Sequence, residues 1–304
     1  MRTASFSYNA GMKAFGSRCV LALAAAILAA AGGSCPAVGP AVEGPELTEE
    51  GLRAYTVTSE YLKGPNVVEV LLPDRMEPER RYPVLYILPV NEGSRGRWGS
   101  GILEAKRTDV HNRHGLICVA PAFDSMPWYA DHPTDPKIRQ ESYLLKVVLP
   151  LVEERHPALK EPRGRMLIGF SKSGWGAFSL LLRHPDLFGK AAAWDAPLVE
   201  ERPERFEMRS IFGTEENFAQ YRITSLLEAR APHLRRGPPR LVLGGYSGFR
   251  NDMDKAHARM QALEIPHVFD NTNRRAHRWD SGWFAETVAR LVALPEDGPA
   301  APSP

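Results

Sequence analysis

The sequence predicts an α/β fold with a mostly parallel central sheet, helices on both faces, and an antiparallel edge formed by the first strands. Two observations support this prediction. Short apolar runs typical of buried strands alternate along the chain with longer segments whose apolar residues have helical spacing. The chain has 304 residues, of which 43% are hydrophobic and 24% charged, so it is long enough for one large domain with a substantial core.

The strands and helices can be placed in order from these patterns. The first two strands are joined by a turn at 64–66, which is typical of an antiparallel hairpin. Pro150 lies inside the first long helical segment and predicts a kink or a break there. We expect strands at 54–61, 67–72, 82–90, 114–123, 165–170, 190–197, 240–246 and 267–270, and helices at 140–156, 172–184, 217–229, 254–263 and before 294.

The N-terminal residues have the pattern of a secretory signal peptide. Lys13 and Arg18 precede the apolar run 19–31, which is short for a membrane span and is followed by small residues. We therefore expect residues 1–35 to be a signal peptide, with translation starting at Met1 or Met12, and the protein to be exported to the periplasm, the cell envelope or the medium. A retained transmembrane helix is the less favoured alternative.

The end of this segment resembles a bacterial lipoprotein signal. Small residues precede Cys35, although such signals prefer leucine where Gly32 stands. Attachment to a membrane through a lipid on Cys35 and plain secretion are therefore both retained as expectations. Cys118 lies in a predicted buried strand, so no disulfide framework is expected.

The composition divides the rest of the chain. Residues 36–50 are rich in Pro, Gly, Ala and Glu and are predicted to be a disordered linker. Residues 51–296 form the predicted folded domain, and 297–304 a disordered tail. Within the domain, the charged and irregular segment 198–237 is a candidate lid.

Neither nucleic acid nor a metal ion is an expected partner of this chain. The net charge is +2 with interspersed signs, so nucleic acid is not an expected partner. His111 and His114 have a metal-like spacing but no cysteine or acidic residue at a fixed offset, so no metal site is expected. The oligomeric state is not predictable from these features.

The segment 165–184 carries the candidate nucleophile. An apolar run ends at Gly169, Ser171 follows, and an apolar run with helical spacing resumes. This predicts a strand, a sharp turn and a helix, which is the geometry of the G-x-S-x-G nucleophile elbow, with Ser173 in place of the last glycine. The N–H of Lys172, at the start of the helix, could then donate to an oxyanion. A serine that merely caps the helix is the alternative interpretation.

The same residues resemble a known family. Ser171-Lys-Ser-Gly-Trp-Gly-Ala, followed by Leu-Leu-Arg-His-Pro-Asp-Leu-Phe188, resembles the elbow and helix of the esterase D-like branch of the α/β-hydrolases. That branch includes S-formylglutathione hydrolases, feruloyl and acetylxylan esterases, enterochelin esterases and mycolyltransferases. The resemblance covers roughly 84–294 and implies the α/β-hydrolase fold, ester hydrolysis through a Ser-His-Asp triad, and no cofactor.

The resemblance also implies the histidine base. In the family a histidine precedes the final helix in the pattern Gly-His-x-Trp-x-x-x-Trp. Ala276, His277, Arg278 and Trp279, followed by Trp283, match this pattern except for the alanine. His277 is therefore the expected base.

The family's acid falls in the loop after the strand 240–246, where two carboxylates are present. Asp252 is favoured over Asp254, because an acid in the opening turn of a helix is explained by the helix dipole alone. Asp195, after the preceding strand, is a third candidate, since some α/β-hydrolases carry the acid there.

The loop 91–101, rich in glycine, follows the strand 82–90, and in this fold the second oxyanion N–H comes from this loop. By the resemblance, Val90 or Asn91 would donate it. The segment 126–136, rich in aromatic residues, would lie at the rim of the site or else close on itself as an ordinary loop. The expected substrate-binding residues are Asn91, Trp128, Tyr129, Trp175 and Trp279.

These features together predict an exported serine esterase that hydrolyses a carboxylic ester on a carbohydrate or on a small extracellular molecule. One alternative is an acyltransferase with the same triad. The other is a catalytically silent binding protein on the same fold, which the departures at Ser173 and Ala276 favour slightly.

Overall fold

A computed structural model describes residues 39–295 of the chain. The predicted signal peptide, with Met12 and Cys35, and the predicted tail 297–304 lie outside the described residues, so these stay predictions. No helix within 39–295 is both long and apolar enough to cross a membrane.

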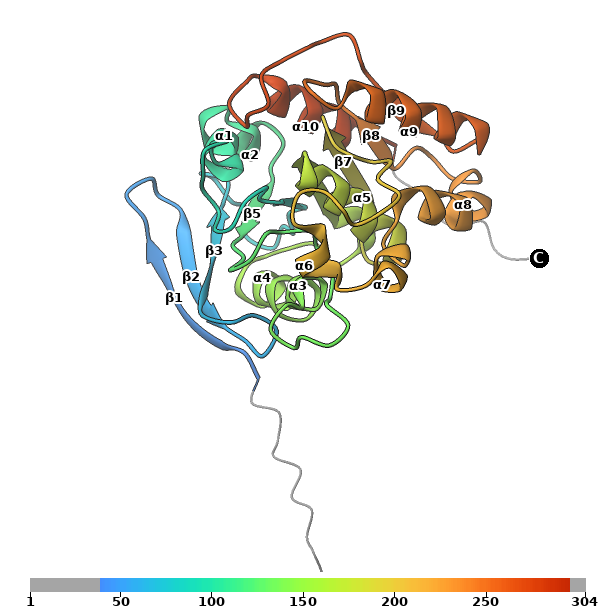
Figure 1. Cartoon of the computed structure of the whole chain (residues 1–304). Coiled ribbons are helices and arrows are strands. Elements are labelled where there is room, and N and C mark those ends of the chain that lie inside the picture. Colours follow the sequence, from blue (N-terminus) through green and yellow to red (C-terminus); the bar gives the residue numbers. More distant parts are fainter. Residues whose placement is uncertain (1–38, 296–304) are drawn as a thin grey trace, which may run out of the picture. The chain divides into compact units, whose positions relative to one another are not determined.

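The domain is built on a nine-stranded sheet with the order β1-β2-β3-β5-β4-β6-β7-β8-β9 (Figure 1). The pairs β1–β2, β2–β3 and β3–β5 are antiparallel, and every other pair is parallel. The predicted antiparallel edge and parallel centre are thus confirmed. The strands are β1 (Ala41–Leu47), β2 (Arg53–Thr58), β3 (Asn66–Leu71), β4 (Val84–Ile87), β5 (Ile117–Pro121), β6 (Arg165–Phe170), β7 (Lys190–Trp194), β8 (Leu241–Leu243) and β9 (His267–Phe269).

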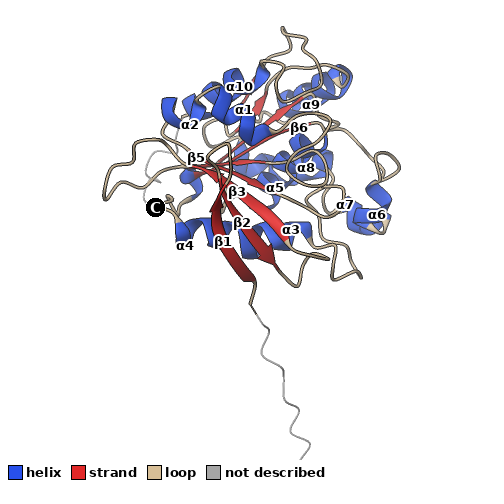
Figure 2. Cartoon of the chain, turned by 90° about the vertical axis from the view of Figure 1, so that its left-hand side faces the viewer, coloured by secondary structure: helices blue, strands red, loops and turns tan. Residues whose placement is uncertain are grey.

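Helices cover both faces of the sheet (Figure 2). The α-helices are α1 (Gly101–Arg107), α2 (Val110–Arg113), α3 (Gln140–Tyr143), α4 (Leu149–Arg155), α5 (Lys172–Arg183), α6 (Met208–Phe212), α7 (Glu215–Ala219), α8 (Ile223–Leu234), α9 (Arg250–Ala262) and α10 (Trp283–Ala293). A π-helical segment, η1 (Leu144–Val148), joins α3 to α4, and a 3₁₀ turn, η2 (Pro162–Gly164), precedes β6.

The sheet separates two hydrophobic clusters. One contains residues of α1 and α10, and the other contains residues of α4, α5, α8 and α9. Strand β6 shows why both form: Ile168 and Phe170 belong to the first cluster and Leu167 to the second, because successive side chains of a strand point to opposite faces. Burial on both faces therefore holds β6 at the centre of the domain and fixes the place where it ends.

The prediction that 36–50 is a disordered linker is wrong for residues 41–47. Residues 41–47 form β1, which pairs with β2 from Ala41 opposite Thr58 to Leu47 opposite Arg53. Backbone hydrogen bonds hold this edge strand, and most of its side chains are exposed. Composition gave no sign of it because the pairing does not depend on an apolar face.

The predicted interruption at Pro150 is present as a change of helix type. Pro150 lies in the first turn of α4, directly after the π-helical segment. Proline has no N–H to bond to the preceding turn, so the wider turn accommodates it without ending the helix.

Most of the candidate lid is a packed part of the domain. The segment 198–237 contains α6, α7 and α8, and its apolar side chains join the core. Trp128 Nε1 also donates to the carbonyl of Phe206 at 3.0 Å, and Asn217 Nδ2 to the carbonyl of Asp131 at 2.9 Å. Movement of this segment stays a prediction.

Candidate active site

The nucleophile elbow has the predicted strand, turn and helix. Strand β6 ends at Phe170 and α5 begins at Lys172, and Ser171 between them has φ 54° and ψ −131°. A non-glycine residue with positive φ is strained and persists only where its surroundings determine it. Ser171 is therefore held by the fold rather than by its own conformational preference.

Ser173, which replaces the usual glycine, reinforces this turn. Its hydroxyl accepts a hydrogen bond from the N–H of Phe170 at 3.1 Å and donates to the carbonyl of the same residue at 2.9 Å. The side chain is fully buried. The departure from the family pattern thus ties the start of the helix to the end of the strand.

Gly169 is needed for close packing at the elbow. A Cβ atom at this position would lie 2.3 Å from the backbone carbon and oxygen of Ser173, which cannot move away without disturbing the turn. We expect Gly169→Ala to lower the free energy of unfolding by at least about 2 kcal/mol. Urea unfolding measures this, with Gly64→Ala as the control, since a Cβ at Gly64 would meet no atom within 4 Å. Equal stabilities of the two variants would contradict the packing argument.

His277 is hydrogen-bonded to a buried carboxylate, that of Asp195. Nδ1 of His277 lies 2.5 Å from Oδ2 of Asp195, whose side chain is 0% exposed. The carboxylate also accepts from the N–H of Gly248 at 3.1 Å and from that of Phe249 at 2.7 Å. Burial raises the pKa of Asp195, but the bonds from His277 and from the backbone outweigh it and hold that pKa below its usual value.

The prediction that Asp252 is the carboxylate on the histidine is therefore wrong. Asp252 lies in the first turn of α9, where burial raises its pKa while Arg205 and Lys255 oppose that rise. Asp254 makes no hydrogen bond to His277 in the described residues either, and its carboxylate accepts from Asn271 Nδ2 at 3.1 Å. Helix α9 begins before both residues, so their backbone direction is set by the helix and not by the histidine loop.

Adjacent strands bring Ser171 and Asp195 together. Phe170 and Trp194 are paired at the ends of β6 and β7, and the next residue on each strand is the serine and the aspartate. The N–H of Ser171 donates to the carbonyl of Asp195 at 3.1 Å. One backbone bond and one side-chain bond thus link Ser171, Asp195 and His277. The sequence signal was present: a carboxylate directly follows an apolar strand that neighbours the elbow strand.

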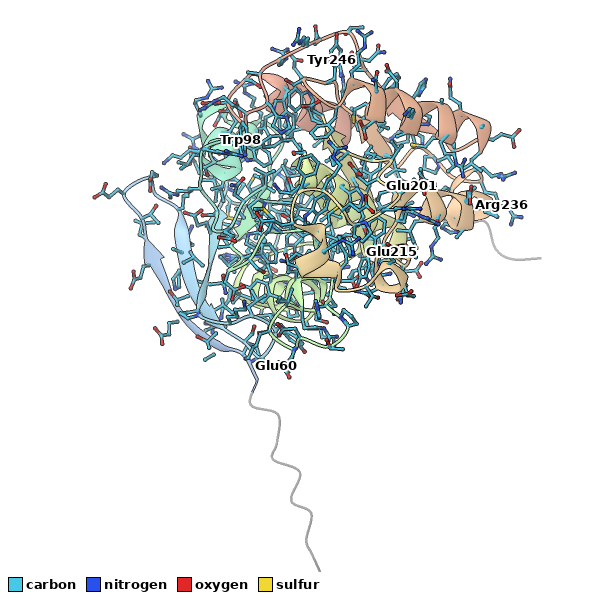
Figure 3. All side chains as sticks on the ribbon, viewed as in Figure 1. Glu60, Trp98, Glu201, Glu215, Arg236 and Tyr246 are labelled. Atoms are coloured by element: carbon cyan, nitrogen blue, oxygen red, sulfur yellow. The ribbon has the colours of Figure 1, made fainter. Side chains whose placement is uncertain are left out.

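The loop that carries His277 is attached at both ends. On one side, the N–H of Arg275 donates to the carbonyl of Tyr246, which follows β8, at 3.2 Å. On the other, the N–H of Trp279 donates to the carbonyl of Trp98, in the loop before α1, at 3.0 Å. Figure 3 labels Tyr246 and Trp98. These bonds fix the loop to two segments that themselves follow sheet strands.

Aromatic rings surround the imidazole of His277. The ring centroids of Phe170, Trp98 and Phe249 lie 4.9, 5.2 and 5.9 Å from it. Trp98 and Phe249 are partly exposed, and Phe206, which is 40% exposed, packs edge to face on Phe249 at 6.0 Å. The sequence reasoning missed these rim residues, although they lie in loops beyond the carboxyl ends of β4, β7 and β8, where ligands bind in such sheets.

Four of the five predicted substrate-binding residues are instead core residues. Trp128, Tyr129 and Trp175 are 0% exposed, and Trp279 is 2% exposed. The rings pack against one another or against other buried aromatics, such as Trp128 on Trp175 and Trp279 on Trp283. Trp128 and Trp175 pack on Phe212 of α6. The ring of Tyr129 packs against α5 at Gly176, and Trp279 lies in the cluster that contains α1 and α10. Asn91 is half-buried and lines a cavity of about 10 Å³, too small for a substrate group.

The predicted oxyanion donors have backbone N–H groups without a hydrogen-bond partner in the described residues. Lys172 is the first residue of α5, where N–H groups have no partner within the helix. Within residues 39–295, the N–H groups of Val90 and Asn91 likewise make no hydrogen bond to the protein. Val90 directly follows Pro89, whose carbonyl is hydrogen-bonded to the hydroxyl of Tyr129.

The side chain of Lys172, the residue after Ser171, is half-buried. Burial lowers the pKa of its amine, Glu207 opposes this shift, and Arg97 adds to it. No ion pair within 4 Å holds the amine among the residues that the structure describes. The side chain is thus partly shielded from solvent, and its amine is not paired with a carboxylate.

No group of three metal-ligating side chains is present in the described part of the chain.

A serine at a strained elbow, a histidine and a buried aspartate, all at the carboxyl edge of a parallel sheet, define the class of serine hydrolases with the α/β-hydrolase fold.

The comparisons with known proteins agree with this class. The model of the family described as "Putative esterase" matches residues 59–280, and the chain belongs to this family. Membership identifies the protein as a carboxylic ester hydrolase, and so disfavours the silent binding protein. No curated protein matches the chain.

Three solved structures show the same fold. A ferulic acid esterase has 18% identity and a TM-score of 0.62, covering 83% of this chain and 95% of its own. An S-formylglutathione hydrolase from Agrobacterium tumefaciens has 15% identity and a TM-score of 0.60, covering 84% and 99%. FphF, a fluorophosphonate-binding serine hydrolase of Staphylococcus aureus, has 14% identity and a TM-score of 0.63, covering 84% and 98%.

Proposed function

We propose that this protein is a serine esterase in which Ser171 is the nucleophile, His277 the base and Asp195 the carboxylate that orients the base. The observation that carries the proposal is the pair of bonds from Asp195, through its carbonyl to Ser171 and through its carboxylate to His277. A buried carboxylate with a lowered pKa accepts and does not donate, so Nδ1 of His277 carries the proton. Nε2 is then the acceptor that a base requires.

The chemical steps follow from this assignment. Nε2 of His277 takes the proton of the Ser171 hydroxyl while the oxygen attacks the ester carbonyl. The alkoxy group leaves with the proton from the imidazolium, which gives an acyl-serine. Water, deprotonated by the same nitrogen, then attacks the acyl group. The bond from the acyl carbon to Ser171 Oγ breaks, the imidazolium returns its proton to Oγ, and the acid is released. The N–H groups of Lys172 and Val90 stabilise the oxyanion formed in both halves of the reaction.

The rim supports an ester with an apolar or aromatic portion. Trp98, Phe249 and Phe206 offer partly exposed rings next to His277. We propose an acyl ester of a carbohydrate or of another small extracellular molecule. The export part of this proposal rests on the N-terminal sequence. The similarity in fold to a ferulic acid esterase is compatible with the proposed substrate.

Covalent labelling with a fluorophosphonate probe tests the proposal. We expect stoichiometric modification of Ser171, identified by mass in the peptide that contains it, together with hydrolysis of short p-nitrophenyl esters. Adding an alcohol acceptor to the same assay separates hydrolysis from acyl transfer, since a transferase would give a new ester. An unlabelled but well-folded protein, or a label on another serine, would refute the mechanism.

A further inference from the structure

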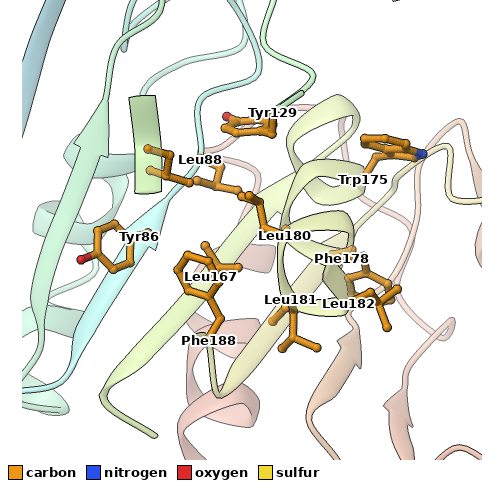
Figure 4. Packing of buried hydrophobic residues seen from close by; sticks show 14 of the residues in the cluster. Tyr86, Leu88, Tyr129, Leu167, Trp175, Phe178, Leu180, Leu181, Leu182 and Phe188 are labelled. Carbon is orange, nitrogen blue, oxygen red and sulfur yellow. The ribbon is translucent and has the colours of Figure 1, made fainter. Parts of the chain in front are cut away.

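Tyr129 makes a buried hydrogen bond next to the proposed oxyanion hole. Its hydroxyl donates to the carbonyl of Pro89 at 2.5 Å, and the whole side chain is 0% exposed. Figure 4 shows the ring close to Leu88, with the hydroxyl on the side away from Trp175. Burial raises the pKa of this phenol well above the usual value, so it remains a donor at any working pH.

The bonded carbonyl belongs to the peptide unit that contains the N–H of Val90. In a trans peptide the C=O and the N–H point in opposite directions, and the unit is planar. A bond that fixes the carbonyl of Pro89 therefore also fixes the direction of the Val90 N–H. That N–H is without a protein partner within residues 39–295, as a donor reserved for a ligand should be.

Other residues hold Tyr129 in an unfavourable backbone conformation. Its φ is 57°, a region that L-residues other than Asn and Asp rarely adopt. The side-chain oxygen of Gln140, itself 0% exposed, accepts from the N–H groups of Trp128 and Tyr129, both at 2.9 Å. Strain of this kind persists where the surroundings impose it and is common at functional sites.

The ring of Tyr129 also contacts the helix that begins at the nucleophile. A Cβ atom on Gly176 of α5 would lie 2.1 Å from Cδ2 of Tyr129, so only glycine leaves space for the ring. One side chain thus touches both elements that carry the proposed donors. It packs on α5, which supplies the N–H of Lys172, and bonds to the segment that supplies the N–H of Val90.

We propose that Tyr129 is a positioning residue for the oxyanion hole, which sets the distance and direction of the Val90 N–H relative to α5. This inference rests on the proposed function, because it concerns the oxyanion of that reaction. Tyr129 does not touch the substrate. Its contribution appears in the transition state, where the charge on the carbonyl oxygen is fully developed.

Tyr129→Phe tests the inference, because it removes the hydroxyl and keeps the ring. We expect kcat for a p-nitrophenyl ester to fall by about tenfold with KM changed by less than about twofold, since loosening a donor costs less than the 10²–10³ lost when one is removed. Inhibition by an alkyl boronic acid, which forms a tetrahedral anion on the serine, should weaken by a similar factor. Rates are normalised to sites titrated with fluorophosphonate, so that unfolded protein does not contribute.

Tyr143→Phe is the matched control. Tyr143 is equally buried and packs on Phe123, as Tyr129 does, but its hydroxyl has no hydrogen-bond partner. We expect wild-type kcat and boronate inhibition for this variant. Circular dichroism and urea unfolding check that both variants keep the fold, and the rates per titrated site count only the folded protein.

Three outcomes separate the possibilities. Loss of kcat and of boronate affinity in Tyr129→Phe but not in Tyr143→Phe supports the inference. Wild-type kcat per titrated site in Tyr129→Phe, or an equal loss in Tyr143→Phe, overturns it and leaves Tyr129 as a core residue only. A wild-type protein that neither reacts with fluorophosphonate nor hydrolyses esters refutes the proposed function itself, and with it the inference.

Discussion

Ser171→Ala and His277→Ala are each expected to lower kcat for ester hydrolysis by about 10⁵- to 10⁶-fold, because nucleophile and base act as a unit. Without the hydroxyl no acyl-enzyme forms, and without the imidazole the hydroxyl keeps its proton. The oxyanion donors and the binding site remain, so a small residual rate above that of water should persist.

The double variant Ser171→Ala/His277→Ala makes this prediction specific. It should be no less active than either single variant, because each substitution already removes the whole unit. Rates with a p-nitrophenyl ester and labelling with fluorophosphonate measure the effect, and circular dichroism checks the fold. Additive losses in the double variant would mean that the two residues act independently, contrary to the mechanism.

Asp195→Asn is expected to lower kcat by about 10⁴-fold at neutral pH, since an amide can favour the wrong tautomer of the histidine. In the structure the carboxylate accepts from Nδ1 of His277, which leaves Nε2 as the acceptor. The side-chain amide of asparagine can donate to Nδ1 instead, which moves the ring proton to Nε2 and disables the base. KM should change much less than kcat.

Asp252→Asn is the matched control for this substitution. Asp252 is a partly buried carboxylate in the same region, and burial raises its pKa, with a contribution from the charge of Asp195. No hydrogen bond joins it to His277 in the described structure. We expect kcat within about threefold of the wild type, as for a side chain outside the reacting unit. A loss in Asp252→Asn that matches or exceeds the loss in Asp195→Asn would reverse the assignment of the acid.

Local patterns were sufficient to predict the elbow. The apolar run that ends at Gly169, the serine two residues later and the helical spacing beyond depend only on residues close in sequence, and β6, Ser171 and α5 follow them. The same holds for the antiparallel start and parallel centre of the sheet, because hydrophobic periodicity and strand–helix alternation are properties of the chain itself. His277 was predicted from the resemblance of a short motif, next to the last helix, to the family pattern.

The tertiary structure decided which carboxylate reaches the histidine and which aromatic residues are accessible. Asp195 and Asp252 both follow apolar strands in sequence. They differ in position, because Asp195 follows β7, which lies beside β6, whereas Asp252 lies in a helix that has already begun. Trp128 and Tyr129 have the composition of a binding rim, but they are buried, Trp128 against α6 and Tyr129 against α5. Trp98 and Phe249, in contrast, stay partly exposed. Contacts of this kind join residues tens of positions apart, and their energies depend on how the elements pack, which local propensity does not encode.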